Sequence, residues 1–420
     1  MADRTLLRNA RVLTCDGDAT ERPHDGDVLI EGDTIAAVSH GRLDLDPAGA
    51  RVIDLGGATV LPGLGDAHVH TSWPLDFVFD HGAIATTAPE RHMVDVVAVV
   101  RTFLESGYTQ IIGAGVTQEF DDTLAKDSIE RGLIPGPRIV PSGMMVAEVG
   151  GLGSDGELME VASDAASLRE IVKVQCDKGV KALKLFISGD GVVPQYPSQD
   201  SYMTDEMLEA AVDEAAKHGA FITVHARGSD SVARAARTGV KIVHHACFLD
   251  DVAISALEAR RDDVWVCPGL HYLYAVVNGH AKPWGITEER VEASGYPIEL
   301  ESQVEGLRKL KAAGIKILSG GDFGHQWTHH GTYAAELQRY VELVDMNPVE
   351  AIHTATRNFD GVTSPLHGGH TGQVREGFLA DLVVVDGDPT ADISVLQDAV
   401  RRRLVLKGGA IAYVNPDAYL

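Results

Sequence analysis

Cysteine is scarce in this chain, and its four residues lie far apart: Cys15, Cys176, Cys247 and Cys267. No two of them have the short spacing of a thiolate zinc site, and four are few for a disulfide framework in 420 residues. Reduced thiols buried as small apolar residues are the expectation, in a cytoplasmic protein.

Positive charge and long apolar runs are also lacking. The chain has 36 Lys and Arg against 61 Asp and Glu, a formal net charge of −25. Such a surface repels nucleic acid and anionic membranes. No apolar stretch is long enough to span a bilayer, and residues 1–5 carry no sign of a signal peptide. We therefore expect a small-molecule substrate and no nucleic acid or membrane partner.

The middle of the chain alternates apolar strand segments with amphipathic helices. The clearest helix is predicted over Asp205–His218, with Thr204 as its cap and Gly219 at its end. The strand segments are 108–112, 138–141, 182–187, 221–225, 240–243, 264–267 and 315–318. With the segment after Pro62 they number about eight, as in a closed barrel. The sequence predicts an α/β fold with a (β/α)8 TIM-like barrel over residues 61–369.

Both ends of the chain contain short strand segments separated by turns. They include residues 6–13, 27–30 and 34–38 near the start, and residues 380–386 and 402–406 near the end. We expect residues 1–60 and 370–420 to form one small β-sandwich domain.

Two histidines stand at the end of the first barrel strand, in Leu61–His70. His68 and His70 are two residues apart, so both side chains face the same side of a strand and two imidazoles can converge on one metal. Paired histidines also occur on ordinary surfaces. Their place at the carboxyl end of a barrel strand favours the metal.

Four more polar residues mark later strands: Lys184 lies inside the apolar run of residues 183–186, and His225, His245 and Asp322 lie at the ends of three other strands. An inward lysine needs a carboxylate partner or a modification such as carbamylation, and the strand alone favours neither. A single strand histidine is more often a core residue than a ligand, and Asp322 alone could cap a helix. All six residues at matching positions of one barrel indicate a metal site.

Four segments carry a family resemblance: residues 60–70, 134–138, 346–356 and 372–384. In them the chain resembles the amidohydrolase superfamily, in particular the branch with Xaa-Pro and Xaa-Arg dipeptidases and related amide hydrolases. The resemblance implies two divalent metal ions, with zinc as the default. It implies that His68, His70 and Asp322 hold one ion and that His225 and His245 hold the other. A carbamylated Lys184 and a hydroxide would bridge them.

The resemblance also implies the reaction. The bridging hydroxide would attack the carbon of an amide-type C–N bond in a small molecule, and Asp322 would move the proton to the leaving nitrogen. The scissile group could belong to an amide, a carbamate, a urea or a cyclic amide. An Xaa-Pro-like dipeptidase, a mononuclear deaminase of the same superfamily and a non-catalytic scaffold are the alternatives. Relatives are commonly homo-oligomers, so we expect one here.

Departures from the family pattern bear on the substrate. Leu152 stands where the dipeptidases have a histidine that holds the α-carboxylate, which argues against that activity. His244 replaces a common glutamate, and Thr109–Ile112 lacks a common arginine. An amide with an aromatic or apolar portion facing Leu152 and Tyr272 is our hypothesis.

Some further residues could contact the substrate, although packing or a salt bridge explains each equally well. The candidates are Leu152, Arg227, His271, Tyr272 and His330.

Overall fold

The computed structural model describes residues 4–44, 49–76, 83–84, 86–119, 121–156 and 158–416. Over these residues the chain is a mixed α/β protein whose strands lie in three sheets. None of the helices in this part of the chain is long and apolar enough to cross a membrane.

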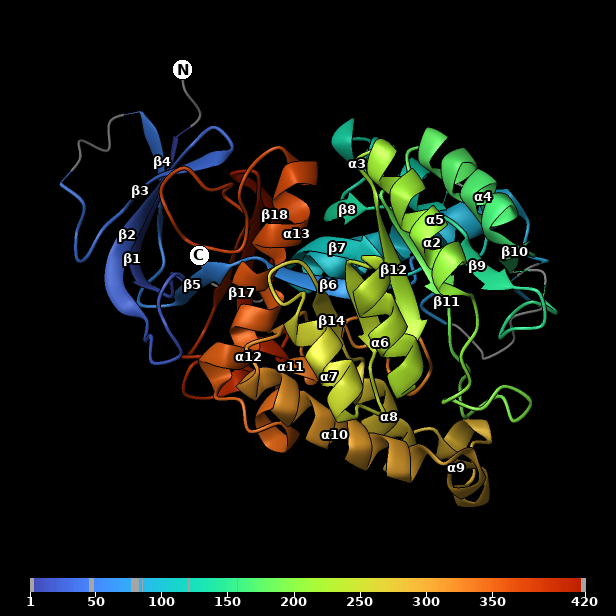
Figure 1. Ribbon diagram of the computed structural model, residues 1–420. Helices are drawn as coiled ribbons and strands as arrows, with labels where there is room; N and C mark the ends of the chain where they lie inside the picture. The colour runs from blue at the N-terminus through green and yellow to red at the C-terminus, as the bar shows by residue number, and fades with distance from the viewer. Residues whose placement is uncertain are drawn as a thin grey trace.

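Strands from both ends of the chain pair in one eight-stranded sheet. It contains β1 (Arg4–Val12), β2 (His24–Glu31), β3 (Thr34–Val38), β4 (Ala50–Asp54), β5 (Thr59–Pro62), β16 (Leu382–Val385), β17 (Arg402–Lys407) and β18 (Ala410–Val414). The ends join where β5 pairs antiparallel with β16, with Leu61 opposite Val383. In Figure 1 this terminal sheet lies to one side of the helices that cover the rest of the chain. A division into two packed sheets stays a prediction.

The strands between these ends are parallel and form two sheets. The three-stranded sheet contains β6 (Leu64–Val69), β7 (Tyr108–Gly113) and β8 (Arg138–Val140). The seven-stranded sheet contains β9 (Met145–Glu148), β10 (Met159–Ala162), β11 (Ala182–Phe186), β12 (Phe221–Ala226), β13 (Ile242–His245), β14 (Trp265–Cys267) and β15 (Lys316–Ile317). Isolated parallel bridges link the two, from Val69 to Phe323 and from Val116 to Met144.

Helices follow most of the parallel strands. They are α2 (Pro89–Glu105), α3 (Asp121–Glu130), α4 (Ala165–Asp177), α5 (Asp205–Lys217), α6 (Ser229–Thr238), α7 (Asp251–Glu258), α8 (Leu270–Val277), α9 (Glu288–Ser294), α10 (Tyr296–Ala312), α11 (Ala335–Leu343), α12 (Pro348–Ala355) and α13 (Arg357–His367), with short 3₁₀ turns at Lys282–Trp284 and Ile393–Leu396.

The predicted helix over 205–218 is confirmed as α5. Thr204 caps it by accepting a hydrogen bond from the Met207 amide, and Asp205 and Glu206 lie at its positive end. Leu208, Ala211 and Ala215 are buried on its inner face. A pattern of apolar residues at helical spacing therefore positions α5 against β12, which carries the predicted ligand His225 near its end.

Candidate metal centre and active site

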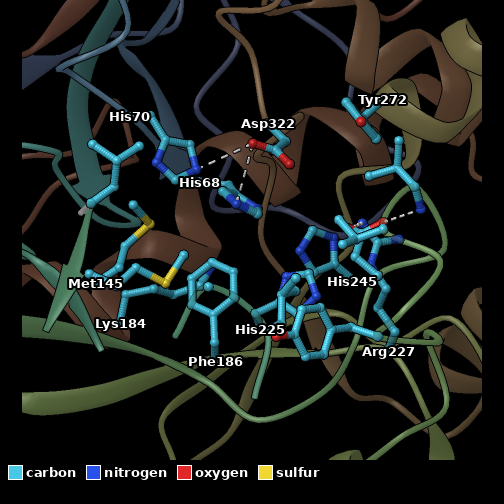
Figure 2. Close-up of a pocket in the computed structure, with 18 of the residues that line it drawn as sticks. His68, His70, Met145, Lys184, Phe186, His225, Arg227, His245, Tyr272 and Asp322 are labelled. Carbon is cyan, nitrogen blue, oxygen red and sulfur yellow. Dashed lines mark hydrogen bonds and ion pairs between the residues drawn. The ribbon is translucent and has the colours of Figure 1, made fainter. Parts of the chain in front are cut away.

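Three of the predicted ligands converge where β6 ends. The Nε2 atoms of His68 and His70 lie 3.5 and 3.4 Å from Oδ1 of Asp322. One ligand atom from each residue falls within 4.8 Å of the others, and all three side chains are buried. Figure 2 shows both imidazoles facing the Asp322 carboxylate. Two imidazole nitrogens and a carboxylate oxygen are a suitable set for a divalent cation.

Backbone conformation brings Asp322 to β6. Asp322 has a φ of +55°, in the left-handed region that few side chains adopt, so the chain turns sharply here. The preceding Gly320 approaches β6 so closely that an added Cβ would lie 2.8 Å from the His68 amide nitrogen. A residue with a side chain at position 320 would push the two segments apart.

His225 and His245 form the other side of the centre. They stand near the ends of neighbouring strands β12 and β13, and their ring centroids are 4.4 Å apart. His225 Nε2 donates to the Gly189 carbonyl at 3.1 Å, and His70 Nδ1 donates to the Gly115 carbonyl at 2.9 Å. Each bond fixes the ring and leaves the other nitrogen free to bind a cation.

Burial keeps three histidines of this centre, His68, His225 and His245, in the neutral form. Burial lowers the pKa of His225 to about 3, with a further contribution from Arg227. Burial also lowers the pKa of His68 and of His245 well below the ordinary value. Neutral imidazole is the form that binds a metal.

Lys184 lies on β11 with its side chain buried in the same cavity. Burial lowers the pKa of its ammonium to about 7, although Asp322 partly offsets this. Among the described residues it forms no hydrogen bond or ion pair, and its nearest recorded partner is the Phe186 ring, 5.7 Å from Nζ. The alternative of an inward lysine paired directly with a carboxylate is therefore not what this structure contains.

One polar atom of the centre supports the presence of a cation. Asp322 Oδ1 is buried and has no hydrogen-bond partner in the described part of the chain, and the Nε2 atoms of His68 and His70 lie beside it. A buried polar atom without a hydrogen bond is costly, so it needs an ion or water. The residues therefore fit the metal that the sequence predicts.

A second group of possible ligands lies beside His68. His68, His244 and Cys267 have ligand atoms within 4.8 Å of one another, and both ring nitrogens of His244 are buried without a partner among the residues placed here. Burial raises the pKa of the Cys267 thiol well above its usual range. The sequence singled out His244 but not Cys267, because only the pairing of β13 with β14 places the two opposite each other.

The centre opens into a cavity of about 330 Å³. All six predicted ligands line it, as do Leu152, Arg227 and Tyr272 from the predicted substrate contacts. Most of the remaining wall is apolar, including Met145, Phe186 and Trp73. In the view of Figure 2, Met145 lies on one side of the histidines, and Arg227 and Tyr272 lie on the other.

His271 and His330 do not line this cavity. The structure places His271 and Tyr272 on helix α8, not in the loop that the sequence predicts, and on α8 only Tyr272 faces the cavity. The His271 ring stacks on Phe323 with centroids 5.5 Å apart. His330 Nε2 donates a hydrogen bond to the Trp73 carbonyl at 3.0 Å. His330 thereby fixes the position of Trp73, which lines the cavity.

Trp73 and His325 are cavity residues that sequence reasoning missed as contacts. Trp73 stacks on His70 with centroids 3.9 Å apart, and His325 meets Trp73 edge-on. Trp73 lies three residues after His70, and this proximity in sequence could have identified it as a cavity residue. Met145, which we would assign to packing from its apolar surroundings in sequence, also lines the cavity.

Buried imidazoles, a lysine and an aspartate at the carboxyl ends of parallel strands, facing one cavity, define a hydrolytic type of enzyme site. The chain belongs to the amidohydrolase family, whose pattern matches residues 59–412. It is an enzyme of the class that acts on carbon–nitrogen bonds.

Individual relatives differ in what they act on. The ochratoxinase of Aspergillus niger is 26% identical over 385 residues, which cover 84% of this chain and 75% of that enzyme. An L-hydantoinase of Paenarthrobacter aurescens is 23% identical over 264 residues, 57% of this chain and 54% of its own. Among solved structures, a Xaa-Pro dipeptidase with bound methionine in its active site has a TM-score of 0.85 and 25% identity, covering 98% of this chain and 100% of that one.

Proposed function

We propose that this chain is a binuclear metal-dependent hydrolase that cleaves an amide-type C–N bond of a small molecule. One observation carries the proposal: six side chains of metal-ligand type, which lie on five strands or directly after them, line one cavity. They are His68, His70, Lys184, His225, His245 and Asp322.

In this proposal His68, His70 and Asp322 hold one divalent cation, and His225 and His245 hold the second. The neutral rings of His68, His225 and His245 support these roles, as does an Asp322 oxygen that has no hydrogen bond among the described residues and lies beside two imidazoles. Zinc is the expected ion because imidazole and carboxylate ligands suit it. When bound, the ions lower the pKa of water and polarise a carbonyl.

Lys184 is the residue proposed to become a carboxylate. With a pKa of about 7, much of its amine is neutral at neutral pH, and a neutral amine can add to carbon dioxide. The resulting carbamate would satisfy a buried side chain that has no polar partner among the described residues. Its two oxygens would hold both cations.

Asp322 is the proposed acid–base residue. Burial opposes its charge, but its contact with His70 lowers its pKa to about 2, so the carboxylate is ionised. Its oxygen faces the histidines, where it can accept the proton of the attacking water and pass it to the leaving nitrogen. His70 and the Gly115 carbonyl behind it orient the carboxylate for this transfer.

The apolar wall supports a substrate with an aromatic or apolar portion beside Leu152 and Tyr272. The similarity to a Xaa-Pro dipeptidase makes dipeptide hydrolysis the second candidate. Leu152 counts against it, since this side chain has no donor for an α-carboxylate. A mononuclear deaminase would leave the buried Lys184 without a role.

The architecture behind this proposal is a (β/α)8 barrel over residues 61–369. The bridges from Val69 to Phe323 and from Val116 to Met144 support it, because they join the two parallel sheets at two places. The terminal sheet would then be the small domain of residues 1–60 and 370–420. A cytoplasmic location and a homo-oligomeric state stay predictions.

Metal content and mass test the proposal together. Elemental analysis of protein purified without chelator should give about two divalent ions per chain, and native mass spectrometry should find carbon dioxide on Lys184. A screen of amides, carbamates, ureas and dipeptides should then find turnover. One ion with an unmodified lysine would contradict the binuclear centre, and turnover of dipeptides alone would favour the second candidate.

A further inference from the structure

Arg227 lines the cavity, and the two terminal nitrogens of its guanidinium already form ion pairs with carboxylates. Its Nη2 lies 2.7 Å from Asp190 Oδ2, and its Nη1 forms a close ion pair with Glu299. The side chain is 1% exposed, and its Nε is buried without a hydrogen-bond partner among the described residues. A ligand in the cavity therefore meets a cation whose two terminal nitrogens bind carboxylates and whose third donor is buried.

Both carboxylates are fixed by other groups. Asp190 accepts hydrogen bonds from the Tyr296 hydroxyl at 2.5 Å and from the Val192 amide at 3.1 Å. Glu299 accepts one from Ser198 at 2.8 Å. The three charged residues come from the segment after β11, the end of β12 and helix α10. Breaking either ion pair to receive another anion would leave a buried carboxylate without its partner, which is strongly unfavourable.

Arg227 and its two carboxylate partners carry a net charge of −1, although Glu299 lies behind the cavity wall and does not line it. Asp155 lines the cavity as a further carboxylate and accepts a hydrogen bond from Tyr196. In the described wall the Lys and Arg residues are Lys184 and Arg227, and Lys184 has its role at the metal centre. The residues that the structure does not describe contain neither Lys nor Arg.

From this arrangement we infer that the substrate carries no carboxylate: it is an uncharged N-acyl compound whose leaving amine or acyl group is apolar. The inference rests on the proposed function and narrows it. An anionic group in this cavity would lose its hydration and gain no basic side chain in return. The chain's net charge of −25 also slows the approach of anions.

A matched pair of substrates tests the inference on the intact metal-loaded enzyme. N-benzoylphenylalanine and N-benzoyl-2-phenylethylamine have the same scissile amide and differ only by the carboxylate. We expect kcat/KM to be at least about 30-fold higher for the uncharged compound, the cost of one unpaired buried charge. If amides with another acyl group are hydrolysed faster, that acyl group replaces benzoyl in both compounds of the pair.

Variants of the Arg227 partners test the cause. Glu299→Gln and Asp190→Asn each remove one carboxylate and release positive charge to the cavity. The preference is the ratio of kcat/KM for the uncharged compound to kcat/KM for N-benzoylphenylalanine. We expect either variant to lower this ratio by about 10-fold. Glu301→Gln is the matched control, since it makes the same charge change on an exposed position of the same helix and should leave the preference unchanged.

The outcomes separate this inference from the proposed function. Equal or faster cleavage of N-benzoylphenylalanine by the wild-type enzyme would overturn the inference while leaving an amide hydrolase in place. No turnover of any amide, carbamate or urea by protein with its metals bound would overturn the proposed function first. Circular dichroism checks that each variant is folded. If a variant does not fold, the ratio of kcat/KM for the two substrates in the wild-type enzyme tests the inference.

Discussion

Lys184 is the residue on which the second cation of the proposed centre depends. Lys184→Ala removes the bridging group, so we expect metal content to fall from about two ions to about one per chain and kcat to fall by at least about 100-fold. Added propionate, a small carboxylate that can enter the space left behind, should restore part of the activity. Elemental analysis and turnover measure both effects.

An exposed lysine provides the comparison. Lys173→Ala on helix α4 removes the same side chain where it is about half exposed, and it should change neither metal content nor kcat. A Lys184→Ala protein that keeps its full metal content would contradict the bridging role.

Leu152 is the residue that separates this cavity from one that binds a dipeptide. It lines the cavity between two glycines and is 9% exposed. Leu152→His introduces a hydrogen-bond donor, so we expect the relative kcat/KM for N-benzoylphenylalanine to rise by about 10-fold. Leu152→Phe adds size without a donor and should not raise it. If Leu152→His leaves the relative kcat/KM for N-benzoylphenylalanine unchanged, position 152 does not contact the part of the substrate that carries the carboxylate.

Helix α8 depends on a side chain from another element. It begins directly after Gly269 and has no side-chain cap of its own. Glu336 of α11 accepts hydrogen bonds from the amides of Leu270 and His271, at 3.0 and 2.6 Å. A carboxylate at a helix N-terminus stabilises it, and here it also fixes the helix that carries Tyr272 into the cavity.

The burial of Glu336 makes stability depend on pH. Burial raises the pKa of Glu336 from 4.5 to about 7, so between these values the folded chain holds a proton that the unfolded chain has released. This group's contribution to the unfolding free energy therefore falls as pH rises from about 4.5 to about 7, by at most about 3 kcal/mol. The unfolding temperature of the wild type should fall over this range relative to Glu336→Gln, which does not titrate.

A charge on the surface of the same helix serves as the control. Glu342→Gln lies at an exposed position of α11, and its difference from the wild type should stay constant with pH. A constant difference for Glu336→Gln as well would contradict the raised pKa.

The parallel strands and the terminal sheet are joined by an ion pair in which Asp381 is buried and Arg138 is partly exposed. Arg138 at the start of β8 binds Asp381 ahead of β16 through two hydrogen bonds of 2.7 and 3.1 Å. Asp381 also accepts from the Gly408 amide at 2.7 Å, and Lys407 donates to the Gly136 carbonyl at 2.6 Å. The two parts of the molecule are thus held together by charge-assisted bonds as well as by packing.

Removing one member of this pair should cost far more than removing a surface pair. We expect Arg138→Ala to lower the free energy of unfolding by about 3 kcal/mol, since Asp381 stays buried without its partner. Arg131→Ala breaks the exposed pair with Asp127 and should cost less than about 1 kcal/mol. Denaturant unfolding of both variants makes the comparison, and equal losses would contradict the joining role of the Arg138 pair.

Local patterns in the sequence determined the elements and the types of ligand. The alternation of apolar segments and amphipathic helices predicted the parallel strands and α5, because burial of one face depends on neighbours in sequence. The two-residue spacing of His68 and His70 fixed their common side, since side chains on a strand alternate. The position of Lys184 within a strand and those of His225 and Asp322 near strand ends followed from the same patterns.

Only the tertiary structure decided which of these side chains meet and what surrounds them. The approach of Asp322 to His68, the neighbourhood of Cys267, and the commitment of Arg227 to Asp190 and Glu299 all join strands and helices far apart in the chain. His271 turned away from the cavity because α8 rotates its side chain toward Phe323. Such contacts depend on strand register and helix packing, which a single sequence does not encode locally.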